Sequence, residues 1–75
     1  MPTHDGSHIL TAISTARNLK RRRKERKMSR FDVSARAGIS PSFYSELEMG
    51  RKAASGDTLR RVTKALDMSL DELQS

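Results

Sequence analysis

The sequence has no cysteine, little aromatic character and no long apolar run. Without cysteine the chain can form neither a disulfide framework nor a thiolate zinc site. No apolar stretch approaches the roughly 20 residues needed to cross a membrane, and the first residues lack the basic-then-apolar pattern of a secretion signal. We therefore expect a protein of the cytoplasm that has no contact with membranes.

Acidic residues are also scarce, because 9 of them stand against 15 lysines and arginines, for a net charge of +6 and a pI near 10.5. Such a surplus favours a polyanionic partner such as nucleic acid. The charge is unevenly distributed, with nine bases and one acid in residues 17–30, and three acids and no base in residues 67–72. At 75 residues the chain makes one domain with a small core.

The first eight residues are short, polar and rich in turn formers, so we expect a flexible tail over 1–8 and a domain over 9–75. His4 and His8 have a spacing that a metal site could use. One of them lies beside Asp5-Gly6, in a segment with no helical pattern. We expect no metal and no cofactor.

The spacing of apolar residues predicts a helix over 9–26, with Ile9, Ile13, Ala16 and Leu19 on one face. Arg23 continues that inward stripe. A buried guanidinium without a partner is unfavourable, and Glu48 is the candidate partner.

A helix-turn-helix is expected over 29–50. Ser29 is placed to cap a helix over 30–37, with Asp32 as the acid of a capping box, and Ser40 followed by proline starts the next helix. Gly38 suits the left-handed turn between them. The small residues Ser34 and Ala35 would let the two helices approach closely. An apolar seam lies inside, formed by Val33, Ala37, Ile39, Tyr44 and Leu47, and the outer side carries Pro41, Ser42, Phe43, Ser45, Glu46 and Met49.

Two further helices are expected, one after Ser55-Gly56-Asp57 and a short one opened by the S-x-x-E capping box at 69–72. Five helices and no strand signal predict an all-α fold.

These pieces together resemble the lambda-repressor-like, Cro-type helix-turn-helix family, which includes phage repressors and restriction-modification controller proteins. The resemblance covers about three quarters of the chain and depends on the order of Arg23, Ser34, GISPS at 38–42, SELEMG at 45–50 and ALDMSLDEL at 65–73. The sequence departs from the family pattern at Lys27, where glycine is common, at Tyr44, where isoleucine or leucine is usual, and at Ala54, where proline is frequent. The resemblance implies a compact five-helix domain and supports an ion pair between Arg23 and Glu48.

The resemblance also implies which residues contact DNA. The expected base-contacting residues are Pro41, Ser42, Phe43, Ser45 and Glu46. Phosphates would be held by Arg30, Ser40, Arg51 and Lys52, and by Arg22 and Arg26 of the basic run beside the helix-turn-helix. Phe43 has the alternative of packing against the preceding helix, and Glu46 that of a surface salt bridge with a base such as Arg51. Ser42 and Ser45 have the alternative of being ordinary exposed residues.

The function expected from this resemblance is sequence-specific binding of double-stranded DNA by a homodimer at a palindromic operator, as a repressor or autoregulator. Apolar side chains near the C-terminus, Met68, Leu70 and Leu73, are the expected dimer interface, and no small-molecule effector is indicated. The alternative is a protein-interaction module of the same fold, such as an antitoxin or an anchoring subunit. An enzyme is not expected, because there is no nucleophile arrangement, phosphate-binding glycine loop or acid pair.

Overall fold

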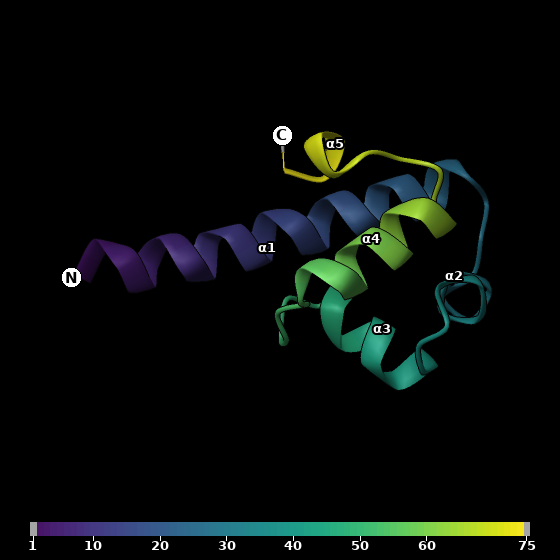
Figure 1. The fold of residues 1–75 in the computed structure, drawn as a ribbon, viewed down its shortest axis with the longest axis horizontal. Helices are drawn as coiled ribbons and strands as arrows, with labels where there is room; N and C mark the ends of the chain where they lie inside the picture. The colour runs from purple at the N-terminus through teal and green to yellow at the C-terminus, as the bar shows by residue number, and fades with distance from the viewer. Residues whose placement is uncertain (1, 75) are drawn as a thin grey trace.

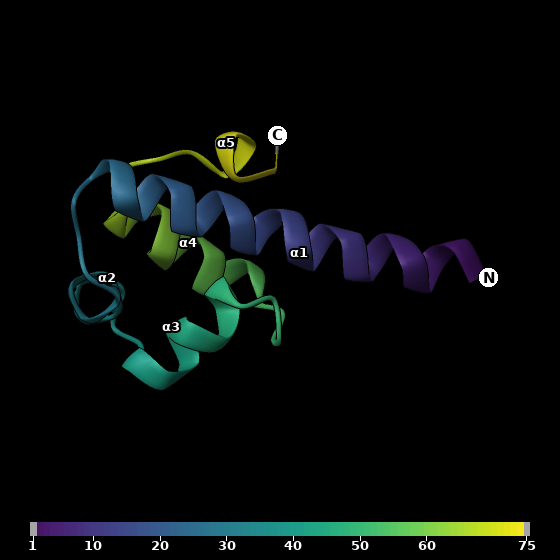
Figure 2. The ribbon, with the colours of Figure 1, turned by 180° about the vertical axis from the view of Figure 1, so that it is seen from behind.

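The computed structural model describes the backbone of residues 2–74 and the side chains of residues 13–73. Within that part of the chain all regular structure is helical, in five helices (Figures 1 and 2). Their bounds are α1 Pro2–Glu25, α2 Arg30–Ala37, α3 Pro41–Glu48, α4 Gly56–Ala65 and α5 Leu70–Gln74. The all-α, five-helix prediction is confirmed.

The first helix begins earlier than the sequence pattern indicates, at Pro2 rather than Ile9. An established helix adds one hydrogen bond for each residue it takes in, and proline is accepted in the first turn because it needs no N–H partner there. The side chains of His4 and His8 lie outside the described residues. The domain boundary at residue 9 and the flexibility of residues 1–8 remain predictions.

The helix-turn-helix is built by local capping bonds. Ser29 Oγ accepts from the Asp32 N–H and Asp32 Oδ2 accepts from the Ser29 N–H, both at 3.0 Å, which completes the expected capping box. Gly38 then adopts φ +73°, the left-handed conformation that ends α2. Ser40 Oγ accepts from the Phe43 N–H at 3.1 Å, and Pro41 occupies the first turn of α3.

The last two helices also start at serine caps, where Ser55 Oγ accepts from the Thr58 N–H and Ser69 Oγ from the Glu72 N–H. Helix α5 packs against α1 on the side away from α3 (Figures 1 and 2). Asn18 of α1, which is buried, donates from Nδ2 to the Leu73 carbonyl at 2.6 Å. This bond ties the C-terminal helix to the first one.

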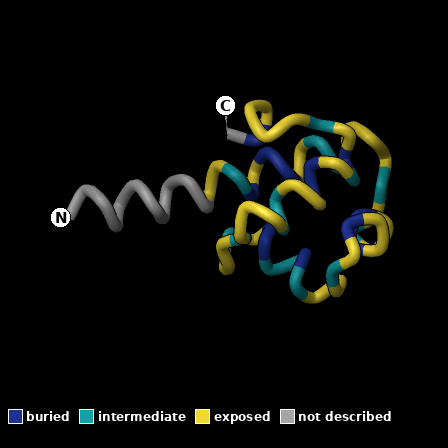
Figure 3. Tube along the Cα trace, in the orientation of Figure 1, coloured by how far each residue is buried: buried dark blue, intermediate teal, exposed yellow. Residues whose placement is uncertain are grey.

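The core joins all five helices. Its fully or nearly buried members are Leu19, Val33, Ala37, Tyr44, Leu47, Val62, Leu66 and Leu73. Figure 3 shows buried stretches of the helices in dark blue, interrupted by exposed stretches in yellow. Ile39 of the predicted seam is half-buried and packs against the core.

Two expected inward residues are exposed. Ile13 is 44% exposed, although the Gly50 backbone lies beside it, and Ala35 is exposed while Ser34 is buried. Ile13 was predicted from the spacing of apolar residues, and Ala35 from its small side chain. Across the described residues, no helix combines the length and the apolar character that crossing a bilayer requires.

Candidate nucleic-acid interface

The outer face of α3 is open to solvent. Pro41 and Ser42 are exposed, Ser45 and Glu46 are half-buried, and Met49 just after the helix is 47% exposed. The inner face of the same helix carries Tyr44 and Leu47 into the core. Because residues three and four apart share a face, Ser42, Ser45 and Glu46 present their polar atoms together on one surface.

Phe43 lies between the two faces. Its side chain is half-buried and packs against the core, and Lys52 Nζ lies 5.9 Å from the ring centroid. At that distance an ammonium is attracted to the aromatic face. The contact holds a cation of the α3–α4 loop close to the first turn of α3.

Glu46 forms no ion pair with any residue whose side chain is described, and only its backbone oxygen meets Arg51, through the Arg51 N–H at 3.0 Å. The alternative role of Glu46, a surface salt bridge with Arg51, is therefore not found. A half-buried carboxylate on the outer face of α3 keeps its hydrogen-bond acceptors available.

The cations predicted to hold phosphates differ in how they are engaged. Arg51 and Lys52 are exposed, whereas Arg30 is 41% exposed at its side chain and donates from Nε to Glu48 Oε1 at 3.2 Å. Ser40 uses its Oγ as the acceptor that caps α3. Its hydroxyl proton is still able to donate.

The structure brings Arg23 and Glu48 together as a buried ion pair between α1 and α3. Arg23 Nε donates to Glu48 Oε2 at 2.5 Å, and Nη2 donates to Oε1 at 3.2 Å. The Glu48 side chain is fully buried and that of Arg23 is 12% exposed. Arg23 Nη1 also donates to the Met28 carbonyl at 2.9 Å, so the same guanidinium fastens the turn that leads into α2.

The titration of Glu48 reflects these contacts. Burial alone would raise the pKa of its carboxyl, but the hydrogen bonds from Arg23 and the charges of Arg23 and Arg30 outweigh it and hold the pKa below 4.5, its ordinary value. Burial raises the pKa of the Tyr44 hydroxyl far above its usual range, and the neighbouring Glu48 carboxylate raises it further. That hydroxyl is buried without a hydrogen bond to a described residue.

Arg22 and Arg26, two of the predicted phosphate ligands, are engaged at the C-terminal end of α4. Arg22 donates from Nε to the Leu66 carbonyl at 3.3 Å and from Nη2 to the Asp67 carbonyl at 2.7 Å. Arg26 Nη1 lies 3.4 Å from Asp67 Oδ2. These contacts give both arginines a structural role within the domain, and their contact with phosphate remains a prediction.

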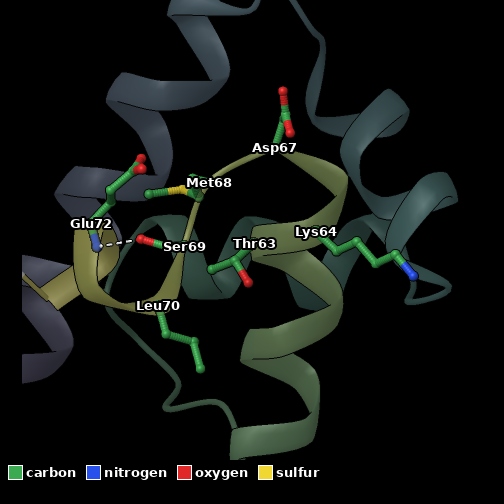
Figure 4. Close-up of a pocket in the computed structure, with 7 residues that line it drawn as sticks. All are labelled: Thr63, Lys64, Asp67, Met68, Ser69, Leu70 and Glu72. Carbon is green, nitrogen blue, oxygen red and sulfur yellow. Dashed lines mark hydrogen bonds between the residues drawn. The ribbon is translucent and has the colours of Figure 1, made fainter.

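The predicted dimer surface is only partly available. Leu73 is fully buried in the core, because α5 packs against α1, so it is corrected from an interface residue to a core residue. Leu70 is 37% exposed and Met68 is half-buried. Both line an open depression of about 540 Å³ at the end of α4, in which Figure 4 shows Leu70 and Lys64 extending away from each other.

Three structural features were missed by the sequence reasoning. These are the bond from Asn18 to α5, the bond from Arg30 to Glu48, and the 68% exposure of Phe31 on α2. Asn18 stands between the buried Ala16 and Leu19, which is a signal that it lies near the core. The other two features have no local signal, because both depend on where α2 docks.

Comparison with known proteins identifies the same helix-turn-helix in related sequences and structures. The family model described as "Helix-turn-helix" matches residues 19–73. A curated relative, "Uncharacterized HTH-type transcriptional regulator YqaE" of Bacillus subtilis (strain 168), is 34% identical over 56 residues, which cover 75% of this chain. The match spans 48% of that protein, so the chain corresponds to about half the length of this relative.

Two crystal structures of the clp gene regulator ClgR from Corynebacterium glutamicum superpose on the fold. Their TM-scores are 0.81 and 0.80, each at 27% sequence identity over 84% of this chain. The aligned region covers 67% of one ClgR chain and 82% of the other. The family model and both structures therefore agree on a helix-turn-helix fold for this chain.

Proposed function

The chain belongs to the Cro/lambda-repressor-type helix-turn-helix family of transcriptional regulators, and we propose that it binds specific sequences in double-stranded DNA. One observation carries this proposal. The outer face of α3 holds solvent-accessible polar side chains, and cations of the following loop lie directly beside it. A helix of this kind fits the major groove, while flexible cations at its ends meet the phosphates.

The division of roles follows from side-chain chemistry. Ser42, Ser45 and Glu46, with Pro41 and Phe43 at the helix start, are the proposed base contacts. A carboxylate repels phosphates, so Glu46 is best suited to accept a hydrogen bond from the exocyclic amine of cytosine. Arg30, Ser40, Arg51 and Lys52 are the proposed phosphate contacts, because an ammonium, a guanidinium or a hydroxyl donates to phosphate oxygens without discriminating between bases.

The proposed active species is a homodimer on a palindromic operator. One recognition helix contacts few base pairs, and a two-fold pair doubles the number, with the two helices about 34 Å apart in successive major grooves. Leu70, which is exposed, and Met68, which is half-buried, lie beside the depression at the end of α4 and supply the apolar side chains for such a contact. Acting in the cytoplasm, the dimer would repress or autoregulate transcription by occupying the operator.

The test combines selection with titration. Duplexes bound by the protein are selected from a random pool, and the affinities of the selected and a scrambled duplex are measured between about 50 and 200 mM salt. We expect a two-fold symmetric consensus and an affinity that falls steeply with salt for both duplexes. Light scattering of the complex at tens of micromolar should give two chains per duplex.

The absence of salt-sensitive binding would contradict the proposal. That result would favour the alternative of a protein-interaction module, such as an antitoxin or an anchoring subunit. A consensus without symmetry, or a single chain per duplex, would contradict the homodimer alone.

A further inference from the structure

The buried carboxylate of Glu48 binds two guanidinium groups that come from two different helices. Arg23 of α1 donates to both carboxylate oxygens, at 2.5 and 3.2 Å, and Arg30 of α2 donates to Oε1 at 3.2 Å. Glu48 itself closes α3 and is fully buried at its side chain. One acidic group therefore connects the first three helices.

The cluster carries a surplus positive charge, because two guanidinium groups share one carboxylate. The Arg23 side chain is 12% exposed, and its guanidinium donates to the Met28 carbonyl as well as to Glu48. The Glu48 carboxylate therefore largely compensates the charge of Arg23. The Arg30 side chain is 41% exposed. The surplus charge is thus presented to solvent by Arg30, at the first residue of α2.

The bond to Glu48 also restricts the direction of the Arg30 guanidinium. Only Nε of Arg30 is bonded, and its two terminal nitrogens have no hydrogen bond to a residue whose side chain is described. A guanidinium holds its five N–H groups in one plane, so a bond at Nε fixes where the other four can point. Such a group can bond a carboxylate on its inner edge and a phosphate on its outer edge at the same time.

We propose that Glu48 is a positioning residue for DNA binding, which holds the Arg30 guanidinium ready for a backbone phosphate. The carboxylate that joins α1 to α3 then also determines the phosphate contact at the start of α2. This inference rests on the proposed function, and it makes Arg30 a contact of fixed geometry. Arg51, which is exposed and bonds Glu46 only through its backbone N–H, serves as a contact by charge alone.

Lysine substitutions separate geometry from charge. Arg30→Lys keeps the positive charge, but an ammonium on a flexible stem cannot hold Glu48 and a phosphate in the fixed planar arrangement. We expect Arg30→Lys to weaken duplex binding about tenfold, while the slope of log affinity against log salt stays the same because the charge is kept. Arg30→Ala should weaken binding further and reduce the slope by about one unit.

Arg60→Lys is the matched control, because Arg60 is exposed on α4 and lies outside the proposed DNA contacts. We expect it to bind within about twofold of the wild type at every salt concentration, since the exchange keeps the charge at a site that meets no phosphate. If Arg30→Lys also binds within twofold, Glu48 does not position Arg30 and the inference is overturned, although the proposed function stands. If no duplex binds in a salt-sensitive way, both fail together.

A measurement without DNA tests whether Glu48 holds the Arg30 guanidinium in place. The Nε–H proton of Arg30 should exchange with water more slowly than that of Arg51 in NMR spectra of the free protein, because it is bonded to a buried carboxylate. Glu48→Gln should speed the exchange at Arg30 and reduce the penalty of Arg30→Lys in duplex binding. Equal exchange at the two arginines would overturn the inference, and that comparison uses the wild-type protein, so it does not depend on whether the glutamine variant folds.

Discussion

Arg22 in α1 donates from Nη2 to the backbone oxygen of Asp67 at 2.7 Å, although 45 positions separate the two residues. Asp67 follows Leu66, the C-cap residue of α4, and adopts the left-handed conformation, with φ 55°. Arg22 Nε donates to the preceding carbonyl, that of Leu66, at 3.3 Å. A guanidinium of α1 thus caps the C-terminus of α4, where a positive charge is also favoured by the helix dipole.

Replacing Arg22 by alanine should therefore lower the stability of the domain. We expect the free energy of unfolding to fall by about 1–2 kcal/mol, since charged donors are lost from two carbonyls in a partly exposed site. The measurement is urea unfolding followed by circular dichroism. Arg21→Ala is the control, because Arg21 is exposed and should change stability by less than about 0.5 kcal/mol. An unchanged salt slope of DNA binding in Arg22→Ala would remove Arg22 from the phosphate contacts.

The pair of Arg23 and Glu48 should be strongly coupled. Arg23→Ala leaves a buried carboxylate and Glu48→Ala leaves a buried guanidinium, so each single change should reduce the free energy of unfolding by about 3–5 kcal/mol. Removing both should destabilise less than the sum of the two. A double-mutant cycle in urea measures this coupling. Additive effects would mean that the two groups do not interact.

Stability should depend on pH through Glu48. Its pKa is lowered in the folded protein, so the unfolded chain takes up the proton first as the pH falls. The contribution of Glu48 is complete at neutral pH and should be lost progressively below about pH 4.5, as the pH falls toward the folded-state pKa. Urea unfolding at a series of pH values should show a steeper loss in the wild type than in Glu48→Gln. Asp32, whose pKa is lowered by the Ser29 N–H, also contributes to the acid loss, and Asp32→Asn measures its part.

Lys27 adopts φ 55° after α1, a conformation that side chains with a Cβ find unfavourable. Lys27→Gly should relieve this strain and raise the free energy of unfolding by about 0.5–1 kcal/mol, after the extra freedom of glycine in the unfolded chain is deducted. The control is Lys24→Gly, in the last turn of α1, which also removes one charge and should destabilise by about 1 kcal/mol. Destabilisation by both changes would show that the turn tolerates lysine without strain.

Glu46 gives the sharpest test of base recognition. Removing this acid should tighten binding to random DNA, because a repulsion of phosphates is lost, and should relax the preference at one base pair in each half-site by about 1–3 kcal/mol. Competition assays with single-base variants of the selected duplex measure that preference. Arg51→Ala is the comparison, since it should weaken all duplexes alike and lower the salt slope by about one unit. An unchanged preference in Glu46→Ala would show that this face of α3 does not meet the bases.

The helices and their caps could be predicted from the sequence because they depend on atoms only a few residues apart. Ser29 meets Asp32, Ser40 meets Phe43, and Gly38 supplies the left-handed turn, so each signal lies within one turn of the feature that it predicts. The ion pair between Arg23 and Glu48 spans 25 positions. It could still be predicted, because a charged residue on the inward face of a helix requires a partner of opposite charge.

Tertiary packing decided the features that have no local signal. Leu73 has the spacing of a surface apolar residue on a short terminal helix, yet it is buried because Asn18 and Leu19 of α1 receive α5. Arg22 and Arg30 stand in a run of similar bases, and what distinguishes them is the partner found 45 or 18 positions away. The sequence by itself determined where α2 to α5 begin and which face of α3 is polar, because those depend on short-range bonds and periodicity. Which arginines hold the domain together and which remain available was decided only when the helices packed, because a guanidinium reaches whichever acceptors the fold places around it.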